Sequence, residues 1–391
     1  MTSLRPWLVI LGLSLGPAVA NGFARFAYGL ILPEMRADLG WTFTEAGWIN
    51  TANAIGYLAG AILALALISR TGPRALFIGG MWLMAAALIF SGLTRDVAAL
   101  SAWRILAGIG GAPVFIAGGV MASAIFGDDK AKGAAAIAVY FGGGGLGMIA
   151  TGWPLPFFMD EFGASVWPLA WIILGVGSAV CFPLSALAAM RAPDPRSGKS
   201  GGGRLPLLAM SPALVAYFGF GLGYTAYITF LVVWMRDGGA EAPLVAGTWA
   251  LMGAAVTVAA PFWSPLLARA EGGLAISVTL IATGFGAAFA LIFPSAPGVL
   301  ASAFIFGASF FMVPTAVTAF GRRNLPEAQW GASLSLMTVV FSVGQIIGPV
   351  AAGAVSDATG GATAGLAVGA GVLFAAAVIG AVQRPLSQPA R

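Results

Sequence analysis

The sequence predicts an all-α integral membrane protein with about twelve transmembrane helices, and three observations support this prediction. Of the 391 residues, 59% are hydrophobic and only 8% are charged, whereas a soluble domain carries roughly a quarter charged residues. Apolar runs separated by proline, glycine and charge clusters recur along the whole chain. A membrane helix needs about twenty apolar residues, so twelve crossings use about 240 residues. The remaining residues suffice for turns, and we expect no sizeable domain outside the membrane.

The first half of the chain contains six apolar runs, and the first run has features of a cleavable signal peptide. Arg5, the apolar stretch after it and Ala18-Val19-Ala20 are typical of such a signal. The stretch continues to Leu32, however, and cleavage would leave an odd number of spans. We therefore expect an uncleaved first helix. The six runs lie near residues 7–32, 44–68, 75–94, 97–126, 133–158 and 165–190.

The second half repeats this organisation after a polar, glycine-rich stretch. Six further runs lie near residues 211–235, 244–268, 274–293, 297–320, 329–355 and 362–383. We expect a six-helix bundle over residues 1–190, a cytoplasmic linker over residues 191–210 and a second six-helix bundle over residues 211–391. Three residues of the first half recur in the second half after 197 positions: Gly147, Asp160 and Gly163 match Gly344, Asp357 and Gly360. This repeat predicts that the two bundles are pseudo-symmetric around a central site.

The basic residues predict how the chain is oriented in the membrane. If the N-terminus is inside, the opposite side holds only Arg36, Arg95 and Arg236. By the positive-inside rule both termini and the linker are therefore cytoplasmic. The net charge of +5 reflects these loops, so we expect a lipid bilayer and no nucleic acid as partner. The basic residues on the cytoplasmic side are Arg5, Arg70, Arg74, Lys130, Lys132, Arg191, Arg196, Lys199, Arg204, Arg269, Arg322, Arg323, Arg384 and Arg391.

The loop between the second and third runs, Ser69-Arg70-Thr71-Gly72-Pro73-Arg74, resembles the short basic loop of the major facilitator superfamily. The family usually has Asp at the position of Ser69 and Gly at the position of Leu65, so the charge contact of that loop is altered in this chain. The resemblance implies that Arg70, Gly72 and Arg74 form a gating loop.

Further motifs extend the resemblance over essentially the whole chain. Arg104-Ile105-Leu106-Ala107-Gly108-Ile109-Gly110-Gly111 resembles the Arg-x-x-x-Gly-x-Gly signature of the superfamily, and Gly344-Gln345-Ile346-Ile347-Gly348-Pro349 is typical of its eleventh helix. Residues 22–28 and 47–53 resemble the bacterial YbfB/YjiJ-like branch. The resemblance implies the major facilitator fold, a place in the bacterial inner membrane and transport by alternating access, but the branch supplies no substrate.

Two arginines lie well inside the predicted spans, Arg25 in the first and Arg104 in the fourth. An arginine at mid-membrane costs a few kcal/mol, so each should face a cavity, a partner or a bound anion. They lie about 12 Å and about 10 Å inward from the outer ends of their spans, which predicts a shared depth. We expect one or both to bind a substrate carboxylate. In the alternative, Arg104 bonds backbone carbonyls and Arg25 extends toward the outer interface.

Polar and aromatic residues are expected to complete the substrate site. Asn50, Asn53 and Tyr57 share one face of the second span because they are three and four residues apart. Tyr224 and Tyr227 lie in a glycine-rich part of the seventh span. Packing between helices is the alternative role of such residues. The predicted substrate-binding set is Arg25, Arg104, Asn21, Asn53, Tyr57, Tyr140, Tyr224, Tyr227 and Gln345.

The absence of certain residue types excludes several function classes. The chain has no histidine and one cysteine, and its acidic residues lie near the ends of spans, where we expect solvated charges: Glu34, Asp38, Glu45, Asp160 and Asp357. We therefore expect no catalytic residue, no metal and no cofactor. No Gly-x-x-x-x-Gly-Lys loop is present, so ATP does not drive the cycle.

These observations predict a monomeric secondary or facilitative transporter that carries a small organic anion by alternating access. Without an acid in mid-membrane, we expect uniport, anion exchange, or symport in which the proton travels with the substrate. The alternatives are efflux of a neutral or amphipathic compound such as a drug or sugar, and a membrane receptor or scaffold that binds without transport. An intramembrane enzyme is the remaining alternative.

Overall fold

A computed structural model of the protein describes residues 4–127, 129–195 and 205–386, and in these ranges every regular element is a helix. Twelve helical segments are long and apolar enough to cross a membrane. The predicted all-α fold with twelve transmembrane helices is therefore confirmed. The predicted linker falls partly on residues 196–204, which lie outside the described residues, as do Arg196, Lys199, Arg204 and Arg391.

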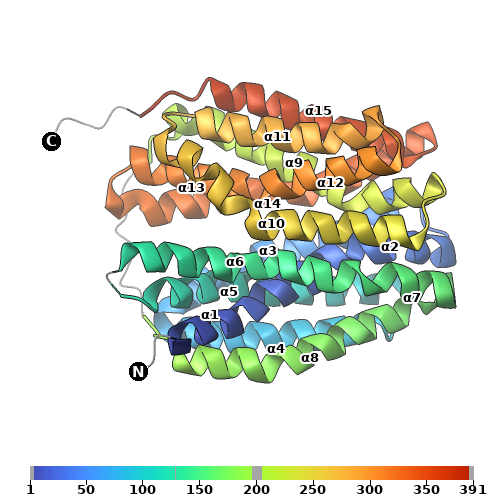
Figure 1. Ribbon diagram of the computed structural model, residues 1–391, viewed down its shortest axis with the longest axis horizontal. Coiled ribbons are helices and arrows are strands. Elements are labelled where there is room, and N and C mark those ends of the chain that lie inside the picture. The colour runs from blue at the N-terminus through green and yellow to red at the C-terminus, as the bar shows by residue number, and fades with distance from the viewer. Residues whose placement is uncertain (1–3, 128, 196–204, 387–391) are drawn as a thin grey trace.

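The two halves of the chain lie side by side, with the first half below and the second half above in Figure 1. The elements of the first half are α1 (Leu4–Pro17), η1 (Ala18–Phe26), α2 (Ala27–Leu39), α3 (Phe43–Thr71), α4 (Pro73–Ser91), α5 (Val97–Ala124), α6 (Lys130–Gly152), α7 (Pro154–Phe162), η2 (Ala164–Val166) and α8 (Trp167–Arg191). Those of the second half are α9 (Leu207–Asp237), α10 (Ala242–Arg269), α11 (Leu274–Ile292), α12 (Ala296–Phe310), α13 (Met312–Asn324), α14 (Glu327–Thr359) and α15 (Ala362–Ala381).

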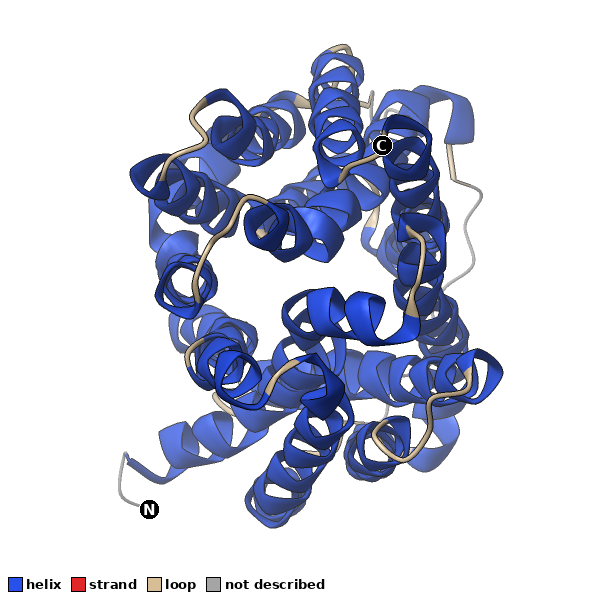
Figure 2. Ribbon diagram, turned by 90° about the vertical axis from the view of Figure 1, so that its right-hand side faces the viewer, coloured by secondary structure: helices blue, strands red, loops and turns tan. Residues whose placement is uncertain are grey.

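The start of α1 and the end of α15 lie at the same end of the molecule, on the left in Figure 1. We call this the near end and the opposite end the far end. Figure 2 is a view onto the far end and shows the helices of both halves and the loops that connect them. In the part of the chain that the structure describes, no strand is present. Any site between the halves is therefore built from helix faces.

The first span is irregular where it carries Arg25. It runs from Arg5 to Leu39, and residues Ala18–Phe26 form a π-helix, η1, directly after Pro17. Proline has no N–H and cannot continue the α-helical ladder, which explains why the change begins there. π-helical segments are frequent at functional sites. The sequence predicted an end near Leu32, but the helix passes through Pro33, because spans tolerate proline where neighbouring helices satisfy the freed carbonyl.

Glycines allow the two halves to approach closely. A Cβ at Gly47 of α3 would clash with the carbonyl of Pro349 in α14, and one at Gly145 of α6 would clash with the backbone of Gly253 in α10. Close backbone contact at small residues is the usual way in which membrane helices associate. The α3–α14 and α6–α10 pairs therefore form the main contacts between the halves.

Candidate functional site

At the far end, an aspartate of the second half caps a helix of the first half. Asp357, close to the end of α14, accepts hydrogen bonds from the N–H groups of Phe43 at 2.7 Å and Thr44 at 2.9 Å. The Thr44 hydroxyl donates to the same carboxylate at 2.5 Å. Phe43 and Thr44 begin α3, so the carboxylate also faces the positive end of a helix dipole. This contact, the α14–α3 latch, joins the halves.

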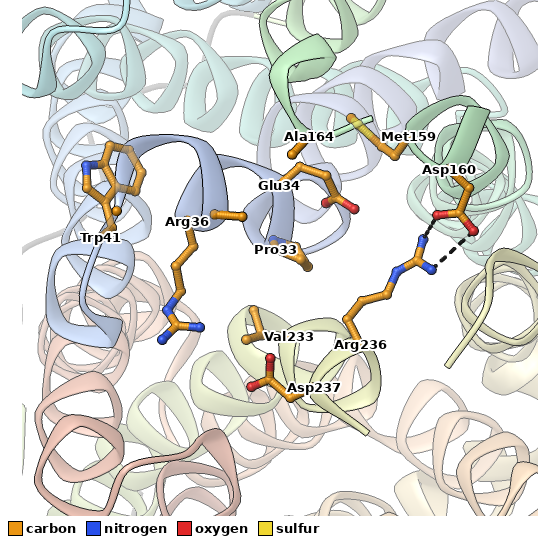
Figure 3. A pocket seen from close by; sticks show the side chains of 12 residues that line it. Pro33, Glu34, Arg36, Trp41, Met159, Asp160, Ala164, Val233, Arg236 and Asp237 are labelled. Carbon is orange, nitrogen blue, oxygen red and sulfur yellow. Dashed lines mark hydrogen bonds and ion pairs between the residues drawn. The ribbon is translucent and has the colours of Figure 1, made fainter. Parts of the chain in front are cut away.

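A second latch joins the halves with the roles exchanged, because an aspartate of the first half contacts a helix of the second half. Asp160 in α7 accepts a hydrogen bond from Arg236 at 2.6 Å and another from the N–H of Ala242, the first residue of α10, at 3.0 Å. Figure 3 shows the ion pair. Asp160 and Asp357 are the aspartates that the 197-residue repeat relates, so the two latches are pseudo-symmetric. The sequence predicted solvated charges at these positions, and the structure shows that they also hold the halves together.

A cavity of 620 Å³ opens beside the second latch (Figure 3). Glu34 and Arg36 of the first span, and Arg236 and Asp237 of α9, are among the residues that line it. The Oε2 atom of Glu34 is buried and has no hydrogen-bond partner in the described residues, so Glu34 is less solvated than the sequence predicted. The cavity lies at the far end of the molecule, beyond the α3–α14 and α6–α10 contacts between the halves.

Arg25 lies in η1 near the middle of the first span and is half-buried. Its guanidinium carbon lies 5.0 Å from the centre of the Tyr57 ring in α3, which is a cation–π distance. Tyr224 of α9, in the second half, is a further neighbour of Arg25. Within the described residues the guanidinium has no ion pair and no hydrogen bond to the protein. Arg25 is therefore an available cation between the two halves.

The second half faces Arg25 with an aromatic and amide surface. Gln345 of α14 is fully buried, and its amide nitrogen donates a hydrogen bond to the Tyr224 oxygen. The other amide atom, Oε1, is buried and has no partner in the described part of the chain. The Tyr224 ring is stacked with Phe220, at 4.8 Å between centroids, and with Phe341, at 5.9 Å. Sequence analysis missed Phe341, because an aromatic residue in an apolar helix carries no signal of its own.

Arg104 has different surroundings, although the sequence predicted that it lies at the same depth as Arg25. It is 0% exposed, donates a hydrogen bond to the Ala24 carbonyl at 2.6 Å and lies 4.7 Å from the centre of the Trp171 ring. Its Nε and Nη1 atoms have no partner among the described residues. All of these contacts lie within the first half. Arg104 therefore bonds the backbone of η1 directly before Arg25.

Comparison with known proteins identifies the family of the chain. Residues 17–381 match the family described as "Uncharacterised MFS-type transporter YbfB". The chain belongs to this family. The resemblance to the major facilitator superfamily that the motifs indicated is thus confirmed. The protein is accordingly an MFS-type membrane transporter.

Similar proteins support this assignment. The inner membrane transport protein YdhP of Escherichia coli strain K12 is 26% identical over 350 residues, which cover 89% of both chains. Among solved structures, the nucleoside transporter NupG gives a TM-score of 0.70 at 14% identity and covers 98% of this chain and 99% of that one. A bacterial homologue of the human lysosomal transporter Spinster, in an inward-facing and unoccupied conformation, gives 0.65 at 15% identity, covering 98% and 96%. These structures share the fold, and the relative indicates a multi-pass inner membrane protein.

Several other predicted residues of the transporter use their polar groups in packing. The Asn53 amide donates to the Arg104 carbonyl at 3.1 Å, and the Tyr140 hydroxyl donates to the Val114 carbonyl at 2.8 Å. Tyr227 shares a hydrogen bond of 2.7 Å with Ser302. Asn21 differs, because its Nδ2 atom is buried without a partner in the described residues. The structure thus brings Arg25, Tyr57, Tyr224 and Gln345 together and gives Asn53, Tyr140 and Tyr227 partners elsewhere.

The predicted gating loop of the transporter is attached to the end of α8. The Arg74 backbone N–H donates to Asp194 at 3.0 Å, and the Arg74 side chain donates to two carbonyl groups near the end of α8. Gly72 has a positive φ of 81° and lies against the Asp194 carboxylate, whereas Arg70 is exposed. Sequence analysis missed Asp194, although it is the one acidic residue between positions 191 and 204. It supplies an acidic contact in a loop that has Ser69 where the family usually has Asp.

Proposed function

We propose that the protein transports a small organic anion by alternating access and that Arg25 binds the anion. The observation that carries this proposal is the half-buried guanidinium of Arg25, which has no anionic partner in the described residues. A cation in this position costs several kcal/mol unless an opposite charge or water compensates it. A substrate carboxylate would form charge-assisted, bidentate hydrogen bonds with the guanidinium group.

The conformation of the molecule supports alternating access. Both latches lie at the far end, and further hydrogen bonds between the halves, Asn50 to Thr229 at 2.6 Å and Thr51 to the Ile346 carbonyl at 2.7 Å, lie at the far end or the middle of the helices. In the proposed cycle the two bundles, residues 1–190 and 211–391, rock about Arg25 and break the latches when the far end opens.

The basic residues support the proposed orientation. Arg70, Arg74, Arg269 and Arg323 lie at or near the near ends of their helices, which supports a cytoplasmic near end by the positive-inside rule. We propose that both termini are cytoplasmic, that the structure is the inward-facing state, and that one copy of the chain in the bilayer is the working unit. Arg70, Gly72 and Arg74 would then form the cytoplasmic gating loop.

We assign the polar residues around Arg25 to two roles. Tyr57, Tyr224, Gln345 and Asn21 are the proposed substrate contacts, since each is a neighbour of Arg25 or has an unpartnered buried polar atom. Arg104 is proposed to position the backbone of η1, because its hydrogen bond ends on the Ala24 carbonyl. Asn53, Tyr140 and Tyr227 are proposed to maintain helix packing.

A neutral planar solute is the second candidate substrate. The observation that favours it is the stack of Phe220, Tyr224 and Phe341, in which the half-buried Phe341 ring keeps surface for contact with a flat molecule. Such a solute would leave Arg25 without a counter-ion, so the organic anion explains more of the site.

The proposal is tested by solute flux into proteoliposomes that contain the purified protein. Radiolabelled carboxylates, nucleosides, sugars and cationic drugs are compared in the wild type, in Arg25→Gln and in Arg269→Gln, a matched variant of an exposed arginine at the near end. We expect saturable carboxylate flux that falls about 100-fold in Arg25→Gln, which corresponds to the loss of about 3 kcal/mol of charge-assisted bonding. Arg269→Gln should transport normally. Flux of neutral or cationic solutes alone, or saturable carboxylate binding without flux, would overturn the proposal.

A further inference from the structure

The site around Arg25 contains aromatic rings and a buried amide that the binding of a carboxylate alone does not require. On the second half, the rings of Tyr217, Phe220, Tyr224 and Phe341 stack almost in parallel, with interplanar angles between 2° and 16°. We call these four residues the aromatic wall. Of the four, Phe341 is half-buried, whereas the others are at most 7% exposed. Phe341 is therefore the ring of the wall that retains surface for another molecule.

The Tyr57 ring faces the same region from the first half. It is half-buried, its centre lies 5.0 Å from the guanidinium carbon of Arg25, and Tyr224 is a neighbour. Arg25, Tyr57 and the aromatic wall are thus neighbours where η1, α3, α9 and α14 meet. Flat rings favour stacking with another flat ring over contact with a saturated one, because the π faces interact in addition to burying area.

Gln345, beside the aromatic wall, has a buried amide oxygen that needs a hydrogen-bond donor. It lies one helical turn after Phe341 on α14, and residues four positions apart share a helix face. Its amide nitrogen is used by Tyr224, while the buried Oε1 atom has no partner in the described part of the chain. A buried carbonyl oxygen without a donor is destabilising, and native proteins rarely keep one without a reason. A donor from a bound molecule would satisfy it.

We infer that the transported anion is an aromatic or heteroaromatic carboxylate that also carries an O–H or N–H donor. Its carboxylate contacts Arg25, its ring stacks on Phe341 beside Tyr57, and its donor bonds the Oε1 atom of Gln345. This inference rests on the proposed function, because it assumes that Arg25 binds the carboxylate. It adds the requirement for a flat ring and for a donor.

Inhibition of carboxylate flux in the same proteoliposomes tests the inference. The probes are 3- and 4-hydroxybenzoate, benzoate, cyclohexanecarboxylate and the neutral 4-hydroxybenzamide. We expect the better hydroxybenzoate to inhibit about tenfold more strongly than benzoate, and benzoate about fivefold more strongly than cyclohexanecarboxylate. The benzamide should be the weakest, because it lacks the charge that Arg25 binds.

Two variants separate the features of the site. Gln345→Leu should remove the advantage of hydroxybenzoate over benzoate, and Phe341→Leu should remove the advantage of benzoate over cyclohexanecarboxylate. Ratios measured within one variant are independent of the amount of folded protein. Equal inhibition by benzoate and cyclohexanecarboxylate in the wild type, with flux still dependent on Arg25, would overturn this inference and leave the proposed function intact. If no carboxylate inhibits or is transported, both are overturned.

Discussion

Arg25 belongs to the π-helical segment of the first span and Arg104 donates a hydrogen bond to that segment, yet their surroundings are opposite. Arg104 is 0% exposed and bonds the Ala24 carbonyl beneath the Trp171 ring. Arg25 is half-buried, and among the described residues its guanidinium lies beside the Tyr57 ring without a hydrogen bond to the protein. A buried arginine with a backbone partner contributes to the folded structure, whereas one with free donors in a shared space can bind a ligand. Two identical residues at similar depth thus have different proposed roles, and each role can be tested.

The largest effect is expected from Arg104→Leu. The substitution leaves the Ala24 carbonyl without its charged donor in a dry interior, which costs about 3 kcal/mol of folding stability. Thermal unfolding of the detergent-solubilised protein should therefore occur several degrees lower. Arg269→Leu, at an exposed position, is the matched control and should leave the unfolding temperature unchanged. If Arg104→Leu keeps its stability but loses substrate binding, Arg104 is a binding residue. The proposed difference between the roles of Arg25 and Arg104 would then be wrong.

A smaller effect is expected from Arg25→Lys. Lysine keeps the positive charge but has no planar fork for bidentate bonding, so carboxylate affinity should fall about tenfold. The unfolding temperature should stay within about one degree, because the protein supplies no hydrogen bond to be lost at Arg25. Flux concentration curves give the affinity. Full affinity in Arg25→Lys would show that only the charge matters, and a large drop in stability would show that Arg25 has a structural role.

The smallest effect is expected at Tyr57. Tyr57→Leu removes the ring under the Arg25 guanidinium, and a cation–π contact at a partly exposed site is worth about 0.5–1 kcal/mol. Carboxylate affinity should fall about two- to fivefold. Tyr57→Phe retains the ring and should bind normally in the same equilibrium assay. Equal losses in both variants would indicate that the hydroxyl group, and not the ring, contacts the substrate.

The sequence predicted the fold and the number of spans because apolar runs of the required length are visible in one dimension. It also predicted that Arg25 and Arg104 lie deep in the membrane. It could not predict which helix face each arginine occupies, because the π-helical segment after Pro17 changes the angular spacing of Arg25 from that of an α-helix. The rise per residue therefore gave the depth of both arginines but not the direction of either side chain.

The sequence also could not show which residues contact each other when they lie far apart in the chain. The matching positions of Asp160 and Asp357 indicated a repeat, but not that each carboxylate caps a helix of the opposite half. The polar groups of Asn53, Tyr140 and Tyr227 look available in the sequence, and only the packed structure shows their hydrogen bonds. Depth in the membrane is encoded locally, whereas the availability of a polar atom depends on its neighbours in space.

The latches also bear on how fast the transporter can cycle. Each consists of an aspartate in contact with the start of a helix at a partly exposed end of the molecule, and such caps and ion pairs are worth about 1 kcal/mol each. Water can replace both partners when they separate. Breaking the two latches alone therefore requires about 2 kcal/mol, and the hydrogen bonds of Asn50 and Thr51 between the halves add to this cost. Dissolved salt screens such contacts, so ionic strength on the far side would alter the resting balance between the two states.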